Sequence, residues 1–236
     1  MIARAVLCPS PPLLARELTG RALVLPELRD ACAAAAARLV KADSDVVAVV
    51  GAGEATATWD ADGRLDVPAY APSSGQATDR AVGTPGLPLA LGLGAMLVDN
   101  AGYAGPRTLQ AVGEDEPPRS CLRLGESLAA AAPRVGLLIV GDGSARRGPS
   151  APGHFDERAM PFDAEVARAI CAGDMAALAA IDPALARELM ATGRPALQVL
   201  AGALGIAPES GPPSAEILYA DDPFGVAYLV AVFEPA

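Results

Sequence analysis

Largely apolar runs of strand length alternate along the chain with longer segments of helical pattern. The runs cover residues 2–7, 45–50, 135–140 and 226–233, and a shorter one at 215–219 precedes the last. Continuous apolar runs of this length are typical of strands that are buried on both faces of a sheet. The pattern therefore predicts a sheet of buried strands.

Pro26 opens an Ala-rich run of helical composition that extends to residue 42, with proline at the first turn, where its missing N–H is tolerated. Further helices are expected over 87–98, 119–132 and 162–205. Within the last of these, Asp174 and Asp182 stand at N-cap positions and Gly193 separates two helical runs. A strand–helix–strand order without repeats or composition breaks predicts one α/β domain over residues 1–236.

The segment between the second strand and the next helix is less regular. Residues 54–72 alternate polar and apolar positions around Asp62-Gly63, which predicts a hairpin turn there. Residues 73–84 have the composition of a loop. Gly51-Ala52-Gly53 lacks the third glycine and the following helix of a dinucleotide fingerprint, so we expect only a tight turn at the end of a strand.

Composition excludes several classes of protein. The net charge of -10 and the 4% aromatic content argue against binding to a phosphate backbone or to stacked bases. No apolar stretch reaches the ~18 residues of a membrane span, and the N-terminal run is too short for a secretory signal, so we expect a cytoplasmic protein. The bias toward Ala, Arg, Gly and Pro suggests a GC-rich bacterium.

The cysteines Cys8, Cys32, Cys121 and Cys171 are far apart and form no CxxC pair. This spacing favours small buried thiols in a reducing compartment over a disulfide framework or a zinc site. Ligands of open α/β sheets bind beyond the carboxyl ends of the strands, so the loops that follow the predicted strands are where chemistry is expected. These loops are CPSPP at 8–12, GAGE at 51–54, GDGSARR at 141–147 and YADDPFG at 219–225.

The polar candidates in these loops do not form a familiar catalytic motif. Gly141-Asp142-Gly143-Ser144 lacks the Gly-Lys-Ser/Thr ending of a phosphate loop, and Ser144 does not stand in a GxSxG elbow. His154, the only histidine, lies in a polar loop bounded by Pro and Gly. We favour an exposed side chain for His154 over a catalytic acid or base, and both interpretations stay open.

Six segments, in this order along the chain, carry a resemblance to a known family. They are CPSPPLL (8–14), VVAVVGAGE (46–54), LIVGDGSARR (138–147), FDAEVARAICAGD (162–174), DPALARELMATGRPALQVLAGAL (182–204) and ILYADDPFGVAYLVAVF (217–233). The chain resembles the subunit-B-like domain of class III extradiol ring-cleavage dioxygenases, in a bacterial branch distantly similar to Memo-type proteins. The similarity weakens between about residues 55 and 118.

The resemblance implies a three-layer domain, with a mixed and largely parallel β-sheet and helices on both faces. Active members of the family hold iron(II) with two histidines and one carboxylate, and use a further histidine as acid/base. In this sequence the first iron histidine corresponds to Ser10, the second falls at Ala52 or Gly53, and the acid/base histidine corresponds to Ala145. The family carboxylate corresponds to Asp221 or Asp222, and the sequence does not distinguish them.

Serine, alanine and glycine do not replace imidazole as iron ligands, so we expect neither an iron cofactor nor ring cleavage. The first hypothesis is a repurposed homologue that binds a small aromatic or other metabolite. Its pocket residues would be Ser10, Gly53, Glu54, Asp142, Ser144 and Asp221. One alternative is an active enzyme with an altered metal site built from His154 and carboxylates. Another is a non-catalytic scaffold or subunit, and a homo-oligomer is compatible with each hypothesis.

Overall fold

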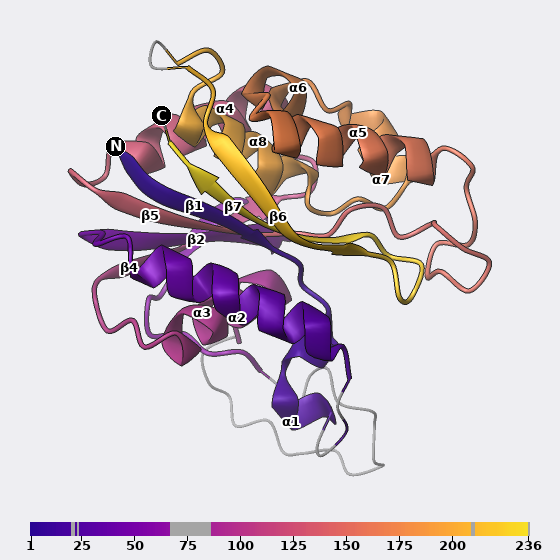
Figure 1. Ribbon diagram of the computed structural model, residues 1–236, viewed down its shortest axis with the longest axis horizontal. Helices are drawn as coiled ribbons and strands as arrows, with labels where there is room; N and C mark the ends of the chain where they lie inside the picture. The colour runs from indigo at the N-terminus through magenta and orange to yellow at the C-terminus, as the bar shows by residue number, and fades with distance from the viewer. Residues whose placement is uncertain (20–21, 23, 67–85, 209–210, 236) are drawn as a thin grey trace.

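The strands lie side by side in the order β3-β4-β2-β5-β1-β7-β6. This computed structural model describes residues 1–19, 22, 24–66, 86–208 and 211–235, and these residues form one sheet between two layers of helices (Figure 1). The strands are β1 (Ile2–Cys8), β2 (Val46–Gly53), β3 (Ala57–Trp59), β4 (Arg107–Gly113), β5 (Val135–Val140), β6 (Ser214–Asp221) and β7 (Tyr228–Glu234). The central pairs β4–β2, β2–β5 and β5–β1 are parallel, and the pairs toward both edges are antiparallel.

Helices cover both faces of this sheet. One face carries α2 (Pro26–Val40) and α3 (Leu89–Asn100), preceded by the short η1 (Pro12–Leu14) and α1 (Arg16–Thr19). The opposite face carries α4 (Pro118–Ala129), α5 (Ala159–Ala172), α6 (Met175–Ala179), α7 (Pro183–Glu188) and α8 (Arg194–Leu204). These layers confirm the predicted α/β class and three-layer architecture. None of the described helices is long and apolar enough to cross a membrane.

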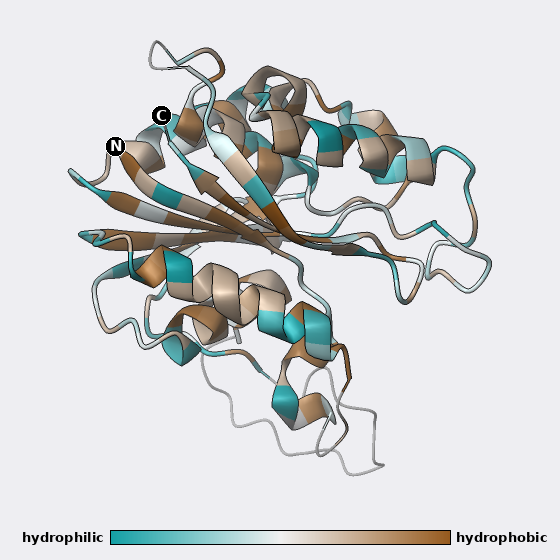
Figure 2. Ribbon diagram, viewed as in Figure 1, coloured by the Kyte–Doolittle hydropathy of each residue, from teal (hydrophilic) through white to brown (hydrophobic). Residues whose placement is uncertain are grey.

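Each helical layer shares its own apolar core with the sheet. Apolar side chains of the central strands alternate between the two cores, so β1, β2 and β5 contribute to both. Figure 2 shows these strands as mainly hydrophobic, with polar residues on the outer helix surfaces. Burial of both faces explains why the sequence shows continuous apolar runs instead of alternation.

The second layer depends on a very close contact between α4 and α8. A Cβ added at Gly125 would lie 2.1 Å from the Val199 carbonyl oxygen, and one at Gly202 would lie 2.1 Å from that of Leu122. Both positions therefore require glycine for the two backbones to approach. The contact lies in the second half of α8 and holds this helix against α4.

Several local predictions are confirmed. Asp174 and Asp182 cap α6 and α7, since their carboxylates accept from the backbone N–H groups of Ala177 and Ala184 at 2.9 Å. The predicted strands at both ends of the chain and at 45–50 and 135–140 are present, each shifted by a few residues at most. The helix expected from 87 is α3, and the helix expected from 119 is α4.

Other local predictions require correction. Strand β4 was not predicted, because RTLQAVG mixes polar and apolar residues. A turn does close at Asp60–Gly63, but β3 before it pairs with β4, which is distant in sequence. The expected turn at Gly51–Gly53 is instead the end of β2, paired with β4. Residues 67–72 of the alternating segment and the loop predicted at 73–84 lie outside the described residues.

The expectation of buried thiols holds for three cysteines. Cys8, Cys32 and Cys121 are buried and form no disulfide with any described residue, whereas Cys171 is exposed on α5. The exposed thiol contradicts the prediction for that position. Cys171 follows the buried Ile170 and points outward, since adjacent helical residues face directions about 100° apart.

Candidate functional site

The carboxyl ends of β1, β2, β4 and β5 lie at one edge of the sheet, because these strands are parallel. Strand β6 also ends at this edge, since it is antiparallel to β7, which is itself antiparallel to β1. The loops singled out from the sequence therefore meet at one edge. This convergence is the arrangement in which open α/β sheets bind ligands.

The direction of the connections divides this edge into crevices. The chain leaves β1 toward the layer of α2 and α3, and it leaves β2 for the same layer only after it has formed β3 on the far side of β4. It leaves β4 and β5 toward the layer of α4 to α8. These strands alternate in the order β4-β2-β5-β1, so neighbouring connections diverge to opposite faces. We name two of the resulting gaps the β1–β5 crevice and the β2–β4 crevice. Both are topological switch points, where ligands commonly bind.

The β1–β5 crevice is closed by a pair of hydrogen bonds. The backbone N–H of Ser10 donates to Oδ1 of Asp142 at 2.7 Å, and the Ser10 hydroxyl donates to Oδ2 at 2.9 Å. Burial raises the pKa of the Asp142 carboxyl, and the two hydrogen bonds from Ser10 oppose that rise. The sequence predicted both residues as pocket residues, and the structure brings them into direct contact.

A second serine–aspartate pair lies behind the first. Ser144 is fully buried, and its backbone N–H donates to Oδ1 of Asp163 on α5 at 2.9 Å while its hydroxyl donates to Oδ2. Burial also raises the pKa of Asp163. Arg147 lies beside this pair, with its Nε 2.8 Å from an oxygen of Asp222 and 3.9 Å from Oδ2 of Asp163. Ser144 therefore holds the loop to α5 and is not exposed as a nucleophile.

Asp163 was not among the predicted site residues. Its signal in the sequence is the FDAE segment, but nothing local to that segment indicates a partner 19 residues earlier. Of the two candidate acids near the end of β6, Asp222 makes the ion pair with Arg147. Asp221 is exposed, and it accepts from the backbone N–H of Asp222 at 2.8 Å.

The remaining candidates do not join this cluster. His154 is exposed in a left-handed conformation with φ of 58°, and its side chain makes no hydrogen bond or ion pair with any residue the structure describes. Ala145 is buried and belongs to the core that the sheet shares with α2 and α3. Tyr228 is buried on β7, where burial, followed by the charge of Asp142, raises the pKa of its hydroxyl.

The β2–β4 crevice is open. A cavity of about 660 Å³ lies beyond the ends of these two strands. It is lined by Gly53, Glu54, Ala55, Thr56, Gly113, Glu114, Asp115, Glu116 and Pro117. Its rim is tied together by Thr56, whose hydroxyl oxygen accepts from the N–H of Gly113 at 3.0 Å and bonds to the carboxylate of Glu116. Of the predicted pocket residues, Gly53 and Glu54 lie here.

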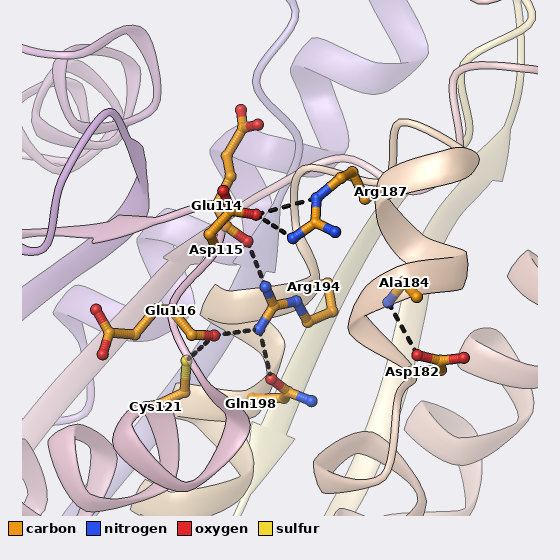
Figure 3. A network of polar contacts seen from close by, with 9 residues as sticks. All are labelled: Glu114, Asp115, Glu116, Cys121, Asp182, Ala184, Arg187, Arg194 and Gln198. Atoms are coloured by element: carbon orange, nitrogen blue, oxygen red, sulfur yellow. Dashed lines mark hydrogen bonds and ion pairs between the residues drawn. The ribbon is translucent and has the colours of Figure 1, made fainter.

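Arg194 on α8 holds the far wall of this cavity in place (Figure 3). Its guanidinium donates to the backbone carbonyls of Glu114 and Glu116, the latter at 2.6 Å, and to Oε1 of Gln198 at 3.0 Å. Gln198 in turn donates to the carbonyls of Ala179 and Ile181. Sequence reasoning missed Arg194, because an arginine in the first turn of an apolar helix resembles any surface charge.

The iron site of the dioxygenases that the sequence resembles does not fit the residues present. At the corresponding positions, the Ser10 hydroxyl is bonded to Asp142, and Ala52, Gly53 and Ala145 carry no ligand atom in their side chains. Across the described part of the chain, no three or more His, Cys, Asp or Glu side chains are grouped so as to hold a metal ion. Iron(II) requires nitrogen and carboxylate donors that converge, and this edge does not supply them.

Comparisons with known proteins bear on the fold. No protein-family model matches the chain, and a search of curated proteins finds no match. Among solved structures, an uncharacterised protein of Escherichia coli K12, JW3007, superposes with a TM-score of 0.54 at 14% identity, over 98% of this chain and 99% of that one. At this identity the likeness establishes a shared fold over essentially the full length of both chains, and only that.

Proposed function

We propose that this protein binds a small organic metabolite in the cavity of the β2–β4 crevice and does not catalyse iron-dependent ring cleavage. The observation that carries the proposal is the contrast between the two crevices. One is filled by the Ser10–Asp142 pair, and the other holds a cavity of about 660 Å³ at a switch point of the sheet. A volume of this size falls within the ~300–1,000 Å³ typical of sites for small organic ligands.

The lining of the cavity restricts the charge of its ligand. The carboxylates of Glu54, Glu114, Asp115 and Glu116 line it, and its described lining contains neither lysine nor arginine. Asp115 is paired with Arg187 outside the lining, and Glu116 is bonded to Thr56. An anionic ligand would meet uncompensated negative potential, so the proposed ligand is neutral or cationic. Catechols are neutral at pH 7 and agree with the small aromatic ligand that the resemblance implies.

The resemblance to class III extradiol dioxygenases enters this proposal only through position. In that resemblance Ser10 corresponds to the first iron histidine, so a hydrogen-bonded serine–aspartate pair stands at this ligand position. The alternative of a metal site with His154 has less support, because its exposed side chain makes no hydrogen bond or ion pair within the described part of the chain. Buried reduced thiols at Cys8, Cys32 and Cys121 agree with a cytoplasmic location.

Isothermal titration calorimetry on the full chain tests the proposal. The ligands are catechol, its cationic aminoethyl derivative and its anionic carboxylate, 3,4-dihydroxybenzoate. We expect the neutral and cationic ligands to bind and the carboxylate to bind at least about tenfold more weakly. Absence of binding by all three, or preference for the carboxylate, contradicts the proposed ligand class.

A matched pair of variants locates the binding. Ala55 lines the cavity and is exposed, so Ala55→Phe fills the space without entering the core. Ala34 is exposed on α2 and does not line this cavity, so Ala34→Phe is the control. We expect Ala55→Phe to abolish binding and Ala34→Phe to preserve it. Equal binding by both variants would place the ligand elsewhere on the protein.

A further inference from the structure

A second, smaller cavity lies between the loop after β4 and the helices α7 and α8. Its volume is about 180 Å³. It is lined by Glu114, Pro183, Ala186, Arg187, Met190, Ala191, Thr192, Arg194 and Pro195. We call it the Arg187–Arg194 pocket. It shares only Glu114 with the lining of the β2–β4 cavity, and the proposed function does not use it.

Arg194 brings a buried charge to this pocket without a carboxylate to neutralise it. The residue is only 3% exposed, and each of its acceptors is neutral: two backbone carbonyls and the amide oxygen of Gln198. Its pKa is lowered, chiefly by burial, and the positive charge of Arg187 lowers it further against the opposing effects of Cys121, Asp115 and Glu116. A buried guanidinium solvated only by dipoles favours an anion at its open side.

Both arginines retain unused donors. The hydrogen bonds of Arg194 come from Nη1 and Nη2, and its Nε–H donates to none of the residues the structure describes. Arg187 uses Nε and Nη2 on one oxygen of Asp115, which leaves Nη1 without a described partner. Figure 3 shows both guanidinium groups beside the loop after β4, with the Glu114 carboxylate turned away from Arg194.

The start of α8 adds to the positive potential. This helix of 11 residues begins at the pocket, and its N-cap, Gly193, supplies no capping side chain. The N–H groups of Gly193 and Arg194 donate to the carbonyls of Asp142 and Ala191, and Pro195 has none, so the positive end of the helix dipole alone adds to the potential here. Thr192 lines the pocket beside it and provides a hydroxyl donor.

We propose that the Arg187–Arg194 pocket binds a small oxyanion, either a phosphate-type ion or a short carboxylate. Arg187, Arg194, Thr192 and the start of α8 surround a space that suits an ion of that size. The volume of about 180 Å³ lies below the ~300 Å³ at which sites for larger organic ligands begin. Asp115 is the competing anion, since it already occupies part of the Arg187 guanidinium.

Calorimetric titration of the full chain with sodium phosphate and with sodium acetate, each against sodium chloride at equal ionic strength, tests the proposal. We expect saturable binding of one ion per chain. Tighter binding of phosphate identifies a phosphate-type ligand, and tighter binding of acetate identifies a carboxylate. If neither ion binds more tightly than chloride, the proposal is wrong.

Three variants separate the role of Arg187 from that of its ion pair. Arg187→Gln removes the cation and should weaken binding at least about tenfold. Asp115→Asn breaks the same ion pair but frees the cation, so it should preserve or strengthen binding. Arg119→Gln removes an exposed charge on α4 and should have no effect. Wild-type binding by Arg187→Gln, or equal loss in Asp115→Asn, overturns the proposal.

The Ala55→Phe variant distinguishes this inference from the proposed function. It fills the β2–β4 cavity and leaves all the lining residues of the Arg187–Arg194 pocket unchanged. Oxyanion binding should therefore be the same in Ala55→Phe and in the wild type. Loss of oxyanion binding in that variant would mean that the anion occupies the larger cavity, which contradicts the inference.

Discussion

The β1–β5 and β2–β4 crevices arise from the same topology but differ in what fills them. At the first, Ser10 and Asp142 come from loops 132 residues apart and meet in two hydrogen bonds. At the second, the strands end in the paired glycines Gly53 and Gly113, and the space beyond them is open. Diverging connections provide a gap in both places, and the side chains decide whether it is a site or a structural contact.

The difference bears on the two positions at which the resemblance places the iron histidines. Gly53, one of the two candidates for the second position, lines the open cavity, whereas the first position is Ser10. In the structure that position is occupied by an internal contact, and the open space lies two strands away, past β5 and β2. The predictions below test whether the closed crevice is structural and the open one functional.

The largest expected effect comes from the support of the open crevice. Arg194→Met removes the donors that hold the carbonyls of Glu114 and Glu116, and leaves these groups and Gln198 without their partner. We expect a loss of about 3 kcal/mol in the free energy of unfolding, measured by urea denaturation. Arg119→Met, at an exposed position of α4, should change it by less than about 0.5 kcal/mol. Similar values for the two variants would show that Arg194 does not support the loop.

The closed crevice should respond next. Asp142→Ala leaves both the N–H and the hydroxyl of Ser10 without an acceptor, and we expect it to cost about 2 kcal/mol in the same assay. The control is Asp221→Ala, since Asp221 is exposed at the same edge and should cost less than about 0.5 kcal/mol. Catechol binding should survive in Asp142→Ala. Loss of binding without loss of stability would make the β1–β5 crevice the functional one.

Much of the fold follows from the sequence for a definite physical reason. Strands buried on both faces must be apolar throughout, so 45–50 and 135–140 are visible as β2 and β5. Strand β4 is not visible in this way, because its first residues, Arg107 and Thr108, are only half-buried near the sheet edge. Its existence depends on pairing with β2, which is a tertiary interaction.

The sequence predicts at which edge of the sheet the candidate site lies, but it does not predict which side chains contact one another there. Loops after parallel strands must converge, so Ser10, Asp142 and Ser144 were found from position alone. Their partners depend on distances that no local pattern encodes, as with Asp163 on α5. Arg194 illustrates the same limit: it is buried against the carbonyls of Glu116 and Glu114, which stand 78 and 80 residues earlier in the chain.

A smaller effect is expected in the pH dependence of stability. Burial raises the pKa of Asp142 and Asp163 in the folded state above that of an unfolded aspartate, so the folded protein binds protons more tightly there. Their contribution to stability therefore grows as the pH falls from neutral through these raised pKa values toward that of an unfolded aspartate. Asp142→Asn should reduce this gain, as followed by urea midpoints across a pH series.

Asp156 provides the opposite control. Hydrogen bonds from Arg158 lower the pKa of Asp156 to about 2. The stabilisation that Asp156 provides is therefore complete above the pKa of an unfolded aspartate, and it is lost as the pH falls from that value toward about 2. Asp156→Asn should thus leave the slope between neutral pH and about pH 4 unchanged. If both variants alter the slope equally, the closed crevice does not hold a buried acid.

The smallest effect is expected from iron. Protein loaded anaerobically with iron(II) and then desalted should retain far less than one ion per chain by elemental analysis, and manganese(II) should behave in the same way. The Ser10 hydroxyl is already bonded to Asp142, and the neighbouring family positions supply no imidazole. Ser10→His tests this reasoning, because a single added imidazole breaks the closed crevice but does not complete a facial triad. We expect it to lose stability without gaining stoichiometric iron. Tight iron in the wild type would instead require a site that recruits His154 and Asp221, and His154→Ala would then have to remove the metal.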